Sequence, residues 1–444
     1  MSSSIIITSA ANANEKVAPP MVPLELSFDP EVLDSLAKWF HPRSADGDWW
    51  WEIMGGHLET MLSAAGYSIT DQSIALLFFY HWVSPRLGPR PTSSKADWKS
   101  FMTDDHSPVE YSWKWGFGDD APAVRYSIEP IGCHAGTRDI LNQKATCELL
   151  TQLHRSRLQG LDLDWFNHFK HALLGPGTPA FKSKAANLSQ STLFMSFEIA
   201  DAARPVGVKA YFLPVDAPGN SSSEQIFRAI ASTCPNLVAV NQLQGFLCDD
   251  VHGRTIRPFM LGIDCVSSTK SRLKIYSRSR ATSFDMVRRV MSVGGQRRGL
   301  EEAEKELHQL WKLTLGLPDD FPVNKELPFN SHETAGVLFY FDVAPDKRAL
   351  PDVKVYIPVR HYAPSDEVSA NGLVQYLNSQ GRGAYTQQYL ETLETLAIGE
   401  SMSESNGVQT YISCAYNNSG KLVITSYITP QFYHPHWFEG GLGN

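Results

Sequence analysis

Five short segments of the chain place basic or aromatic side chains at every second residue, and this alternation limits the possible folds more than any other feature. Successive side chains of a β-strand point to opposite faces. In the segment 271–277, Arg272, Lys274 and Tyr276 would therefore share one face, and the other face would be aliphatic. Related alternation recurs in the segments 124–130, 207–213, 353–359 and 421–427. Five such strands indicate an internal repeat whose polar faces converge.

The strand-like segments come in five pairs, most of them linked by short polar turns of the kind found in hairpins. The pairs span residues 109–115 with 124–130, 192–199 with 206–213, 259–266 with 271–277, 335–343 with 352–359, and 409–416 with 421–428. Ten antiparallel strands form a sheet that tends to close, because closure removes its exposed edges. We therefore predict an α+β fold: a ten-stranded antiparallel barrel with a solvent-accessible lumen, ringed by helices.

Helical patterns flank and separate these pairs, at about residues 30–40, 49–64, 71–83 and 301–313. Residues 1–25 are rich in Ser, Ala and Asn, which predicts a disordered tail. We expect residues 26–444 to form a single domain of five repeats. The three consecutive tryptophans, Trp49 to Trp51, are expected to pack in the core.

Composition excludes several classes of partner. The net charge of −8 argues against a nucleic-acid partner. The six cysteines show no C-x-x-C spacing, which is typical of free thiols in a reducing compartment. The sequence shows neither a secretion signal nor an apolar run of 18 residues. We expect a cytoplasmic protein, monomeric or homodimeric, without a membrane partner.

The polar face of the predicted barrel combines cations with phenols. Its cations are Arg125, Lys209, Arg272, Lys274 and Lys354, and its tyrosines are Tyr211, Tyr276, Tyr356 and Tyr427. Five cations in one cavity are tolerable only if a concentrated anion, such as a diphosphate, lies among them. Tyrosine rings attract a cation. Together they favour ionisation of an allylic diphosphate, with the carbocation shielded from water by aromatic walls. A solvated surface position is the alternative for each basic residue taken alone.

Two glutamates add candidate catalytic groups. Glu110 shares its strand face with Ser112 and Lys114, so we expect it in the lumen, either as a general base or in a salt bridge to a lumen cation. Glu129 lies on the face of Arg125, and we expect it to be the partner of that arginine. The two glutamates could instead form a glycosidase pair, but a neutral sugar would leave the five cations without a partner.

The chain has no DDxxD motif and no glycine-rich nucleotide motif. Magnesium held by carboxylates at a diphosphate is therefore not expected. We expect no metal or other cofactor, because the lumen cations can take over the electrostatic role of the metal.

Longer motifs carry a family resemblance that covers about residues 30–430. They are LGPRP at 87–91, SPVE at 107–110, VRYSIEPI at 124–131, VKAYFLP at 208–214, SRLKIY at 271–276 and VKVYIPV at 353–359. With them the chain resembles the fungal aromatic prenyltransferases of the dimethylallyltryptophan synthase family. The resemblance implies five αββα units around a ten-stranded barrel, in agreement with the strand count.

The resemblance also implies roles for individual residues. It places Glu110 at the glutamate that bonds the acceptor N–H, and Met102 at an apolar residue whose backbone touches the acceptor. The basic residues implied at the diphosphate are Arg125, Lys209, Arg272, Lys274 and Lys354. The residues implied as the tyrosine shield are Tyr211, Tyr276, Tyr356 and Tyr427.

Two departures from the family pattern concern the acceptor. Members that use free tryptophan have an arginine thirteen residues before Arg272, where this chain has Phe259. Some also have a lysine on the strand that spans residues 193–197 here, and this chain has none. We therefore expect a neutral acceptor, such as a tryptophan-containing cyclic dipeptide, in metal-independent transfer from dimethylallyl diphosphate. A barrel that carries an anionic isoprenoid or lipid without turnover is the alternative.

Overall fold

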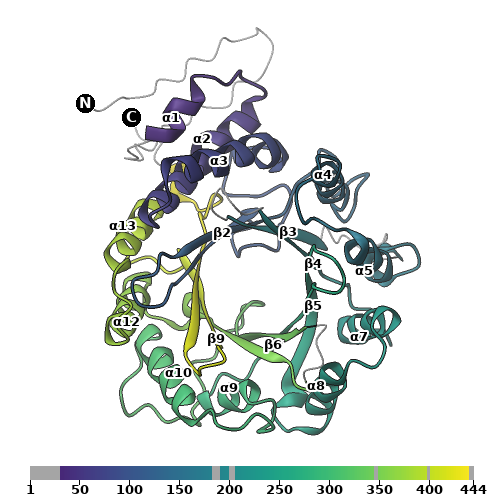
Figure 1. The fold of residues 1–444 in the computed structure, drawn as a ribbon, viewed down its shortest axis with the longest axis vertical. Helices are drawn as coiled ribbons and strands as arrows, with labels where there is room; N and C mark the ends of the chain where they lie inside the picture. Colours follow the sequence, from purple (N-terminus) through teal and green to yellow (C-terminus); the bar gives the residue numbers. More distant parts are fainter. Residues whose placement is uncertain (1–30, 183–190, 200–205, 345–348, 398–400, 440–444) are drawn as a thin grey trace.

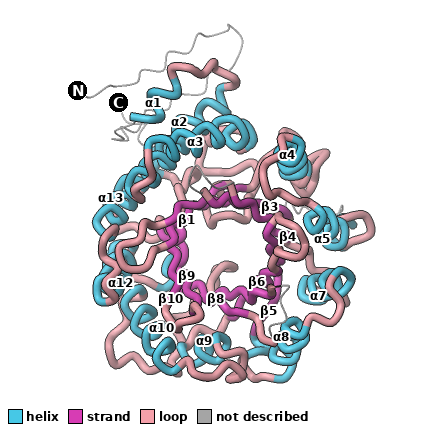
Figure 2. The backbone as a smooth tube through the Cα atoms, viewed as in Figure 1, coloured by secondary structure: helices cyan, strands magenta, loops and turns pink. Residues whose placement is uncertain are grey.

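Ten antiparallel strands close into a barrel in this computed structural model, and helices surround the barrel on its outside (Figure 1). The structure describes residues 31–182, 191–199, 206–344, 349–397 and 401–439, so the tail predicted over residues 1–25 lies outside it. The strands are β1 (Val109–Lys114), β2 (Ala123–Ile128), β3 (Leu193–Glu198), β4 (Gly207–Phe212), β5 (Ile256–Asp264), β6 (Leu273–Ser279), β7 (Val337–Val343), β8 (Asp352–Ile357), β9 (Gln409–Tyr416) and β10 (Leu422–Ile428). Each strand pairs with its neighbours in the chain, and β1 pairs with β10 to close the barrel. Figure 2 shows the strands as a ring inside the helices. The predicted fold class is confirmed.

The helices cover the outer face of the barrel. They are α1 (Glu31–Ala37), α2 (Ala45–Ala64), α3 (Ile69–Phe78), α4 (Lys144–Arg155), α5 (Asp164–Leu174), α6 (Pro179–Lys182), α7 (Ser222–Thr233), α8 (Val238–Asp249), α9 (Phe284–Met291), α10 (Glu301–Thr314), α11 (Val359–Tyr362), α12 (Asp366–Ser379), α13 (Thr386–Leu396) and α14 (His436–Glu439). Local sequence sets several of their starts: Ser221 and Glu224 form a capping box at α7, and the Ser44 hydroxyl caps α2. The third predicted helix begins at Ile69, two residues earlier than expected, and the Ser68 hydroxyl caps it. No helix in the described ranges is long and apolar enough to span a membrane.

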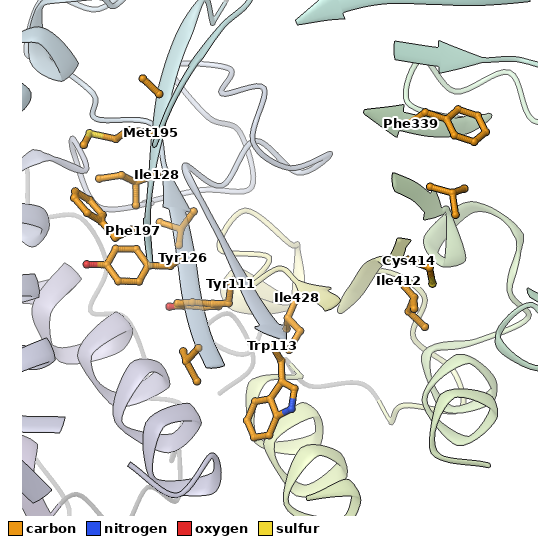
Figure 3. Packing of buried hydrophobic residues seen from close by; sticks show 14 of the residues in the cluster. Tyr111, Trp113, Tyr126, Ile128, Met195, Phe197, Phe339, Ile412, Cys414 and Ile428 are labelled. Carbon is orange, nitrogen blue, oxygen red and sulfur yellow. The ribbon is translucent and has the colours of Figure 1, made fainter. Parts of the chain in front are cut away.

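Two separate apolar clusters follow from the period-two alternation of the strands. The large outer cluster joins outward-facing strand residues to the helices, and Figure 3 shows Tyr111, Trp113 and Tyr126 pointing from the strands toward the helices. The three tryptophans at the start of α2 are buried in it, as predicted. The smaller cluster lies in the lumen and is mainly aromatic. The outer cluster therefore supplies the core, and the lumen face of each strand is left for polar and aromatic side chains.

Strand β5 departs most from prediction, because it begins three residues earlier than expected and its pairing with β6 is irregular. Pro258 pairs with Ser277 and Met260 pairs with Tyr276, so Phe259 lies in a bulge between them. A bulge redirects the side chains around it. Arg257, on the far side of this bulge, is exposed and bonds the Arg254 carbonyl oxygen at 3.1 Å.

Candidate active site

Strand β6 runs from one end of the lumen to the other and contributes side chains to each part of the candidate site. Its lumen face carries Lys274, Tyr276 and Arg278 at successive alternate positions, and Arg272 comes directly before the strand. With about 3.3 Å of rise per residue, Lys274 and Arg278 are separated by roughly 13 Å along the strand. One strand therefore contributes to a cationic end, an aromatic middle and a second polar end. Arg278 was not among the predicted site residues, although it continues the same alternation.

Carboxylates accompany the predicted cations at the first end. Glu198 on β3 forms ion pairs with Arg125 and with Lys209, the latter at 3.1 Å. Burial alone would raise the pKa of Glu198, but Lys209 and Arg125 hold that pKa at about 2. The expectation that Glu129 pairs with Arg125 is therefore wrong, because Glu198 does so.

The cations of β6 have their own acidic partners. Asp264 on β5 lies 2.6 Å from Lys274 and 2.8 Å from Arg272, and Asp342 on β7 lies 3.1 Å from Arg272. Although burial raises the pKa of Asp264, Lys274 and Arg272 lower it to about 2. The expectation that only a bound anion makes the lumen cations tolerable is wrong, since these carboxylates partly neutralise them.

Lys354 on β8 forms no ion pair with the carboxylates described above, unlike the other four predicted cations. Burial, followed by repulsion from Arg125 and Lys209, lowers its pKa to about 7. Its Nζ lies 5.5 Å from the centre of the Tyr340 ring. Lys114 on β1 adds a sixth basic residue to this end, where it interacts electrostatically with Arg125 and Lys209. Positive charge therefore exceeds negative charge among the described residues here, as a polyanionic ligand requires.

The predicted tyrosines come together in the middle of the lumen. The Tyr356 hydroxyl lies 3.5 Å from that of Tyr276 and 3.3 Å from that of Tyr427, and the Tyr211 and Tyr276 ring centres are 5.9 Å apart. Burial raises the pKa of each of these phenols, so they remain neutral. Gly262 permits the close approach, because a Cβ at that position would lie 3.0 Å from the Tyr211 ring.

Two further tyrosines belong to this aromatic layer and were not predicted. The Tyr340 ring centre lies 5.1 Å from that of Tyr276, and the Tyr411 ring centre lies 5.9 Å from that of Tyr356. Tyr340 alternates with Asp342 on β7, so the sequence pattern that revealed the other lumen residues was present here too. We call these six tyrosines the aromatic belt.

Glu110 on β1 lies beyond the aromatic belt, away from the cations. It lines a cavity of about 120 Å³ together with Met102, Phe259 and Tyr427. The Thr410 hydroxyl donates to its Oε1 at 2.9 Å. Burial raises the pKa of Glu110 to about 8, despite the opposing effect of that hydrogen bond. Its pKa therefore lies close to neutral pH, where a carboxyl can both take up and release a proton, as acid–base catalysis requires. The expected alternative, a salt bridge to a lumen cation, is not formed among the described residues.

Phe259 and Arg278 lie next to each other on the wall of the same cavity. The Arg278 guanidinium carbon is 5.6 Å from the centre of the Phe259 ring, and one of its nitrogens donates to the Thr334 carbonyl oxygen. Arg360 also lines the cavity, but its Nε forms an ion pair with Asp104 at 2.9 Å. Phe259 and residues 193–197 supply no cation for an acceptor, but Arg278 and Arg360 both line this end of the lumen.

One group of side chains in the described ranges has the composition of a metal site. Asp104, His332 and His361 offer ligand atoms within 4.8 Å of one another. The Thr334 hydroxyl lies between them, 2.9 Å from Asp104 Oδ1, 2.8 Å from His332 Nδ1 and 2.7 Å from His361 Nε2. Because Arg360 already pairs with Asp104, a divalent ion would face a neighbouring positive charge. The group is better described as a hydrogen-bond network around the Thr334 hydroxyl at the edge of the cavity.

The carboxylate of Glu129 is held in a buried hydrogen-bond network, which indicates a structural role. Its carboxylate accepts hydrogen bonds from Trp98 Nε1 at 2.7 Å, Asn142 Nδ2 at 3.0 Å and the hydroxyls of Ser100 and Ser191. These bonds fix the segment that leads to Met102. A catalytic pair of Glu110 and Glu129 is not supported, because Glu129 is fully buried in this network.

Comparison with known proteins gives consistent matches. The family described as tryptophan dimethylallyltransferase matches residues 46–392. Prenyltransferase anuH of Penicillium roqueforti is 37% identical over 423 residues, which cover 91% of this chain and 93% of that protein. Xanthone prenyltransferase B of Emericella nidulans is 35% identical over 423 residues, 88% of this chain and 89% of that protein. The solved structure of NotF in complex with brevianamide F and DMSPP superposes with a TM-score of 0.74 at 20% identity, over 90% of this chain and 98% of that one.

Proposed function

Because the chain belongs to the tryptophan dimethylallyltransferase family and is a prenyltransferase, we propose that it transfers a dimethylallyl group from dimethylallyl diphosphate to an aromatic acceptor without a metal ion. The observation that carries this proposal is the order of groups along the lumen: cations, then the aromatic belt, then a single carboxyl of raised pKa. An isoprenoid carrier has no use for such a carboxyl beyond the aromatic belt, so that alternative is not favoured.

The donor half of the proposed site lies at the cationic end. The allylic C–O bond breaks and its electron pair leaves with the diphosphate, whose charge is balanced by the basic residues. The residues proposed for this role are Arg125, Lys209, Arg272, Lys274 and Lys354. The carbocation then lies against the aromatic belt, where Tyr211, Tyr276, Tyr356 and Tyr427 exclude water and face it with their rings.

The acceptor half of the proposed site lies around Glu110. The acceptor ring supplies the electron pair of the new bond to the carbocation and then loses a proton, so the products are prenylated acceptor, diphosphate and a proton. Glu110 accepts a hydrogen bond from the N–H or O–H of the acceptor and increases the electron density of the ring. Met102 and Phe259 provide apolar contacts.

A tryptophan-containing cyclic dipeptide or another neutral indole is the proposed acceptor. Phe259 supports it, because an apolar side chain stands where tryptophan-using relatives of the resembled family carry arginine. A phenolic acceptor is the second candidate. It is favoured by the 35% identity to a protein named as a xanthone prenyltransferase, whose named substrate class has no indole N–H. A base of pKa about 8 suits either kind of acceptor.

The test is a mass-spectrometric screen of the purified enzyme with dimethylallyl diphosphate and four acceptor classes: free tryptophan, cyclic dipeptides, other neutral indoles and phenols. Each reaction is run with and without excess EDTA. We expect prenylated product in at least one neutral class, at an undiminished rate in EDTA. Loss of activity in EDTA with recovery on adding magnesium would contradict the metal-independent mechanism.

A further inference from the structure

Arg278 is a cation that the proposed mechanism does not use. It lies on the lumen face of β6, two residues beyond Tyr276 and on the side of the aromatic belt opposite to Lys274. It lines the Glu110 cavity. It is therefore in the acceptor half of the lumen and too far along the strand to serve the diphosphate.

The surroundings of Arg278 leave its charge unbalanced. In the described part of the chain it forms no ion pair, and its polar contacts there are the Thr334 carbonyl oxygen and Tyr411. The nearby Asp104 already pairs with Arg360 and accepts from the Thr334 hydroxyl. The other carboxyl on the cavity wall, Glu110, is largely protonated at neutral pH. The cavity wall consequently carries a positive charge that its own acids do not cancel.

A guanidinium also has more donors than these contacts use. It carries five N–H groups in a planar fork, and the described hydrogen bonds engage a minority of them. The Phe259 ring, 5.6 Å away, restricts one side of the guanidinium without accepting a conventional hydrogen bond. An oxygen on a bound acceptor is the group that would complete this arrangement.

We propose that Arg278 determines acceptor specificity by donating hydrogen bonds to a carbonyl or carboxylate oxygen that the acceptor carries outside its reacting ring. This inference rests on the proposed function for the existence of an acceptor in this cavity. It narrows the acceptor class to aromatics with such an oxygen substituent. Carbonyl and carboxylate oxygens both accept hydrogen bonds from a guanidinium, and the experiment distinguishes between them.

The experiment compares three indoles that differ in this substituent: a tryptophan-containing cyclic dipeptide with carbonyls, free tryptophan with a carboxylate, and 3-methylindole with neither. We expect Arg278→Gln to lower kcat/KM by at least tenfold for whichever oxygen-bearing acceptor the wild type uses, chiefly through KM. A hydrogen bond to a charged group is lost in that variant, which accounts for a change of this size. Turnover of 3-methylindole should stay within twofold. Arg278→Lys keeps the charge but lacks the planar fork of donors. Its kcat/KM for the oxygen-bearing acceptor should lie between those of the wild type and Arg278→Gln.

Arg257→Gln is the matched control, because Arg257 is the cross-strand neighbour of Arg278 but is exposed and bonds only a nearby carbonyl in the described contacts. We expect it to leave all three acceptors within twofold. An equal loss for 3-methylindole in Arg278→Gln would make Arg278 part of the scaffold, and an unchanged dipeptide and tryptophan rate would remove it from recognition. Both results overturn the proposal.

A binding measurement separates failure of this inference from failure of the proposed function. Titration calorimetry with enzyme saturated by dimethylallyl thiolodiphosphate reports acceptor affinity without turnover. If no indole is prenylated, the same calorimetry is carried out with two phenols: 4-hydroxyphenylacetate, which has a carboxylate, and 4-ethylphenol, which does not. Tighter binding of the carboxylate in the wild type, lost in Arg278→Gln, would support the inference while the indole assignment fails. Equal affinities in both proteins would overturn it.

Discussion

Replacing Glu110 by glutamine should change activity and stability in opposite directions. Burial raises the pKa of this carboxyl from 4.5 to about 8, so the folded protein resists its ionisation. An acid whose folded pKa is raised loses stabilisation as the pH rises from its unfolded pKa through its folded pKa. Each pH unit in that window costs about 1.4 kcal/mol. Because the side chain is partly exposed to the cavity, we take the total above pH 8 as about 3 kcal/mol.

Glutamine stays neutral at every pH and keeps nearly the same shape. Glu110→Gln should therefore be more stable than the wild type at pH 8.5 and about equally stable near pH 4.5. For a chain of this length, about 3 kcal/mol corresponds to about 3 °C in Tm. Prenyl transfer should fall about 10²- to 10⁴-fold, because the variant lacks a proton-accepting carboxylate. Donor affinity should be unchanged, since Glu110 lies beyond the aromatic belt from the cations.

The assays are calorimetric melting at the two pH values, single-turnover transfer to the best acceptor, and titration with dimethylallyl thiolodiphosphate. Glu129→Gln is the control, because it replaces a fully buried glutamate whose oxygens accept from Trp98, Asn142, Ser100 and Ser191. That variant should lose about 1–3 kcal/mol of stability, since the new amide N–H₂ faces donors. A Glu110→Gln protein with wild-type turnover would refute the base assignment. One with lower stability at pH 8.5 would refute the electrostatic argument.

Two further predictions concern the donor half of the lumen. Tyr211→Ala or Tyr427→Ala should increase the ratio of free prenyl alcohol to prenylated acceptor, because water gains access to the carbocation; an unchanged ratio in both variants would make these tyrosines structural. Donor binding at pH 8 should take up close to one proton, because the diphosphate restores the pKa of Lys354 from about 7 toward 10.5. Calorimetry in buffers of different ionisation enthalpy measures that uptake, which Lys354→Gln should reduce, and absence of uptake in the wild type would contradict the low pKa.

The sequence predicted the barrel well because its determinants are local. Alternation of side chains within a strand depends only on the pleat, and it placed Arg125, Lys209, Lys274 and Lys354 on the lumen face of their strands. The same alternation extends to further lumen residues. Applied two residues further along β6 it yields Arg278, and applied to β7 it yields Tyr340 and Asp342.

The remaining features depend on contacts that no local pattern encodes. The Phe259 bulge shifts the register of β5, so the alternation of side chains does not continue through it. Thr334 and Asp104 lie outside the strands, 230 residues apart, and meet only because the barrel has closed. The pairing of Arg125 with Glu198 rather than Glu129 likewise depends on the register between β2 and β3. Register and loop placement depend on tertiary contacts, so local patterns in a single sequence do not reveal them.

The division of the protein into two apolar clusters explains how its lumen can hold unfavourable charges. Burial destabilises the charged forms of Lys354, whose pKa is about 7, and of Glu110, whose pKa is about 8. The outer cluster between strands and helices contains the large buried side chains and supplies the hydrophobic stabilisation. It is separate from the lumen cluster, so substitutions in the lumen do not open cavities in the core. A bound donor and acceptor would stabilise the charged forms of both groups at once, because the diphosphate favours the lysine cation and a hydrogen bond from the acceptor favours the carboxylate. Binding energy is thereby directed to the two groups that, in the proposed mechanism, flank the reacting carbons.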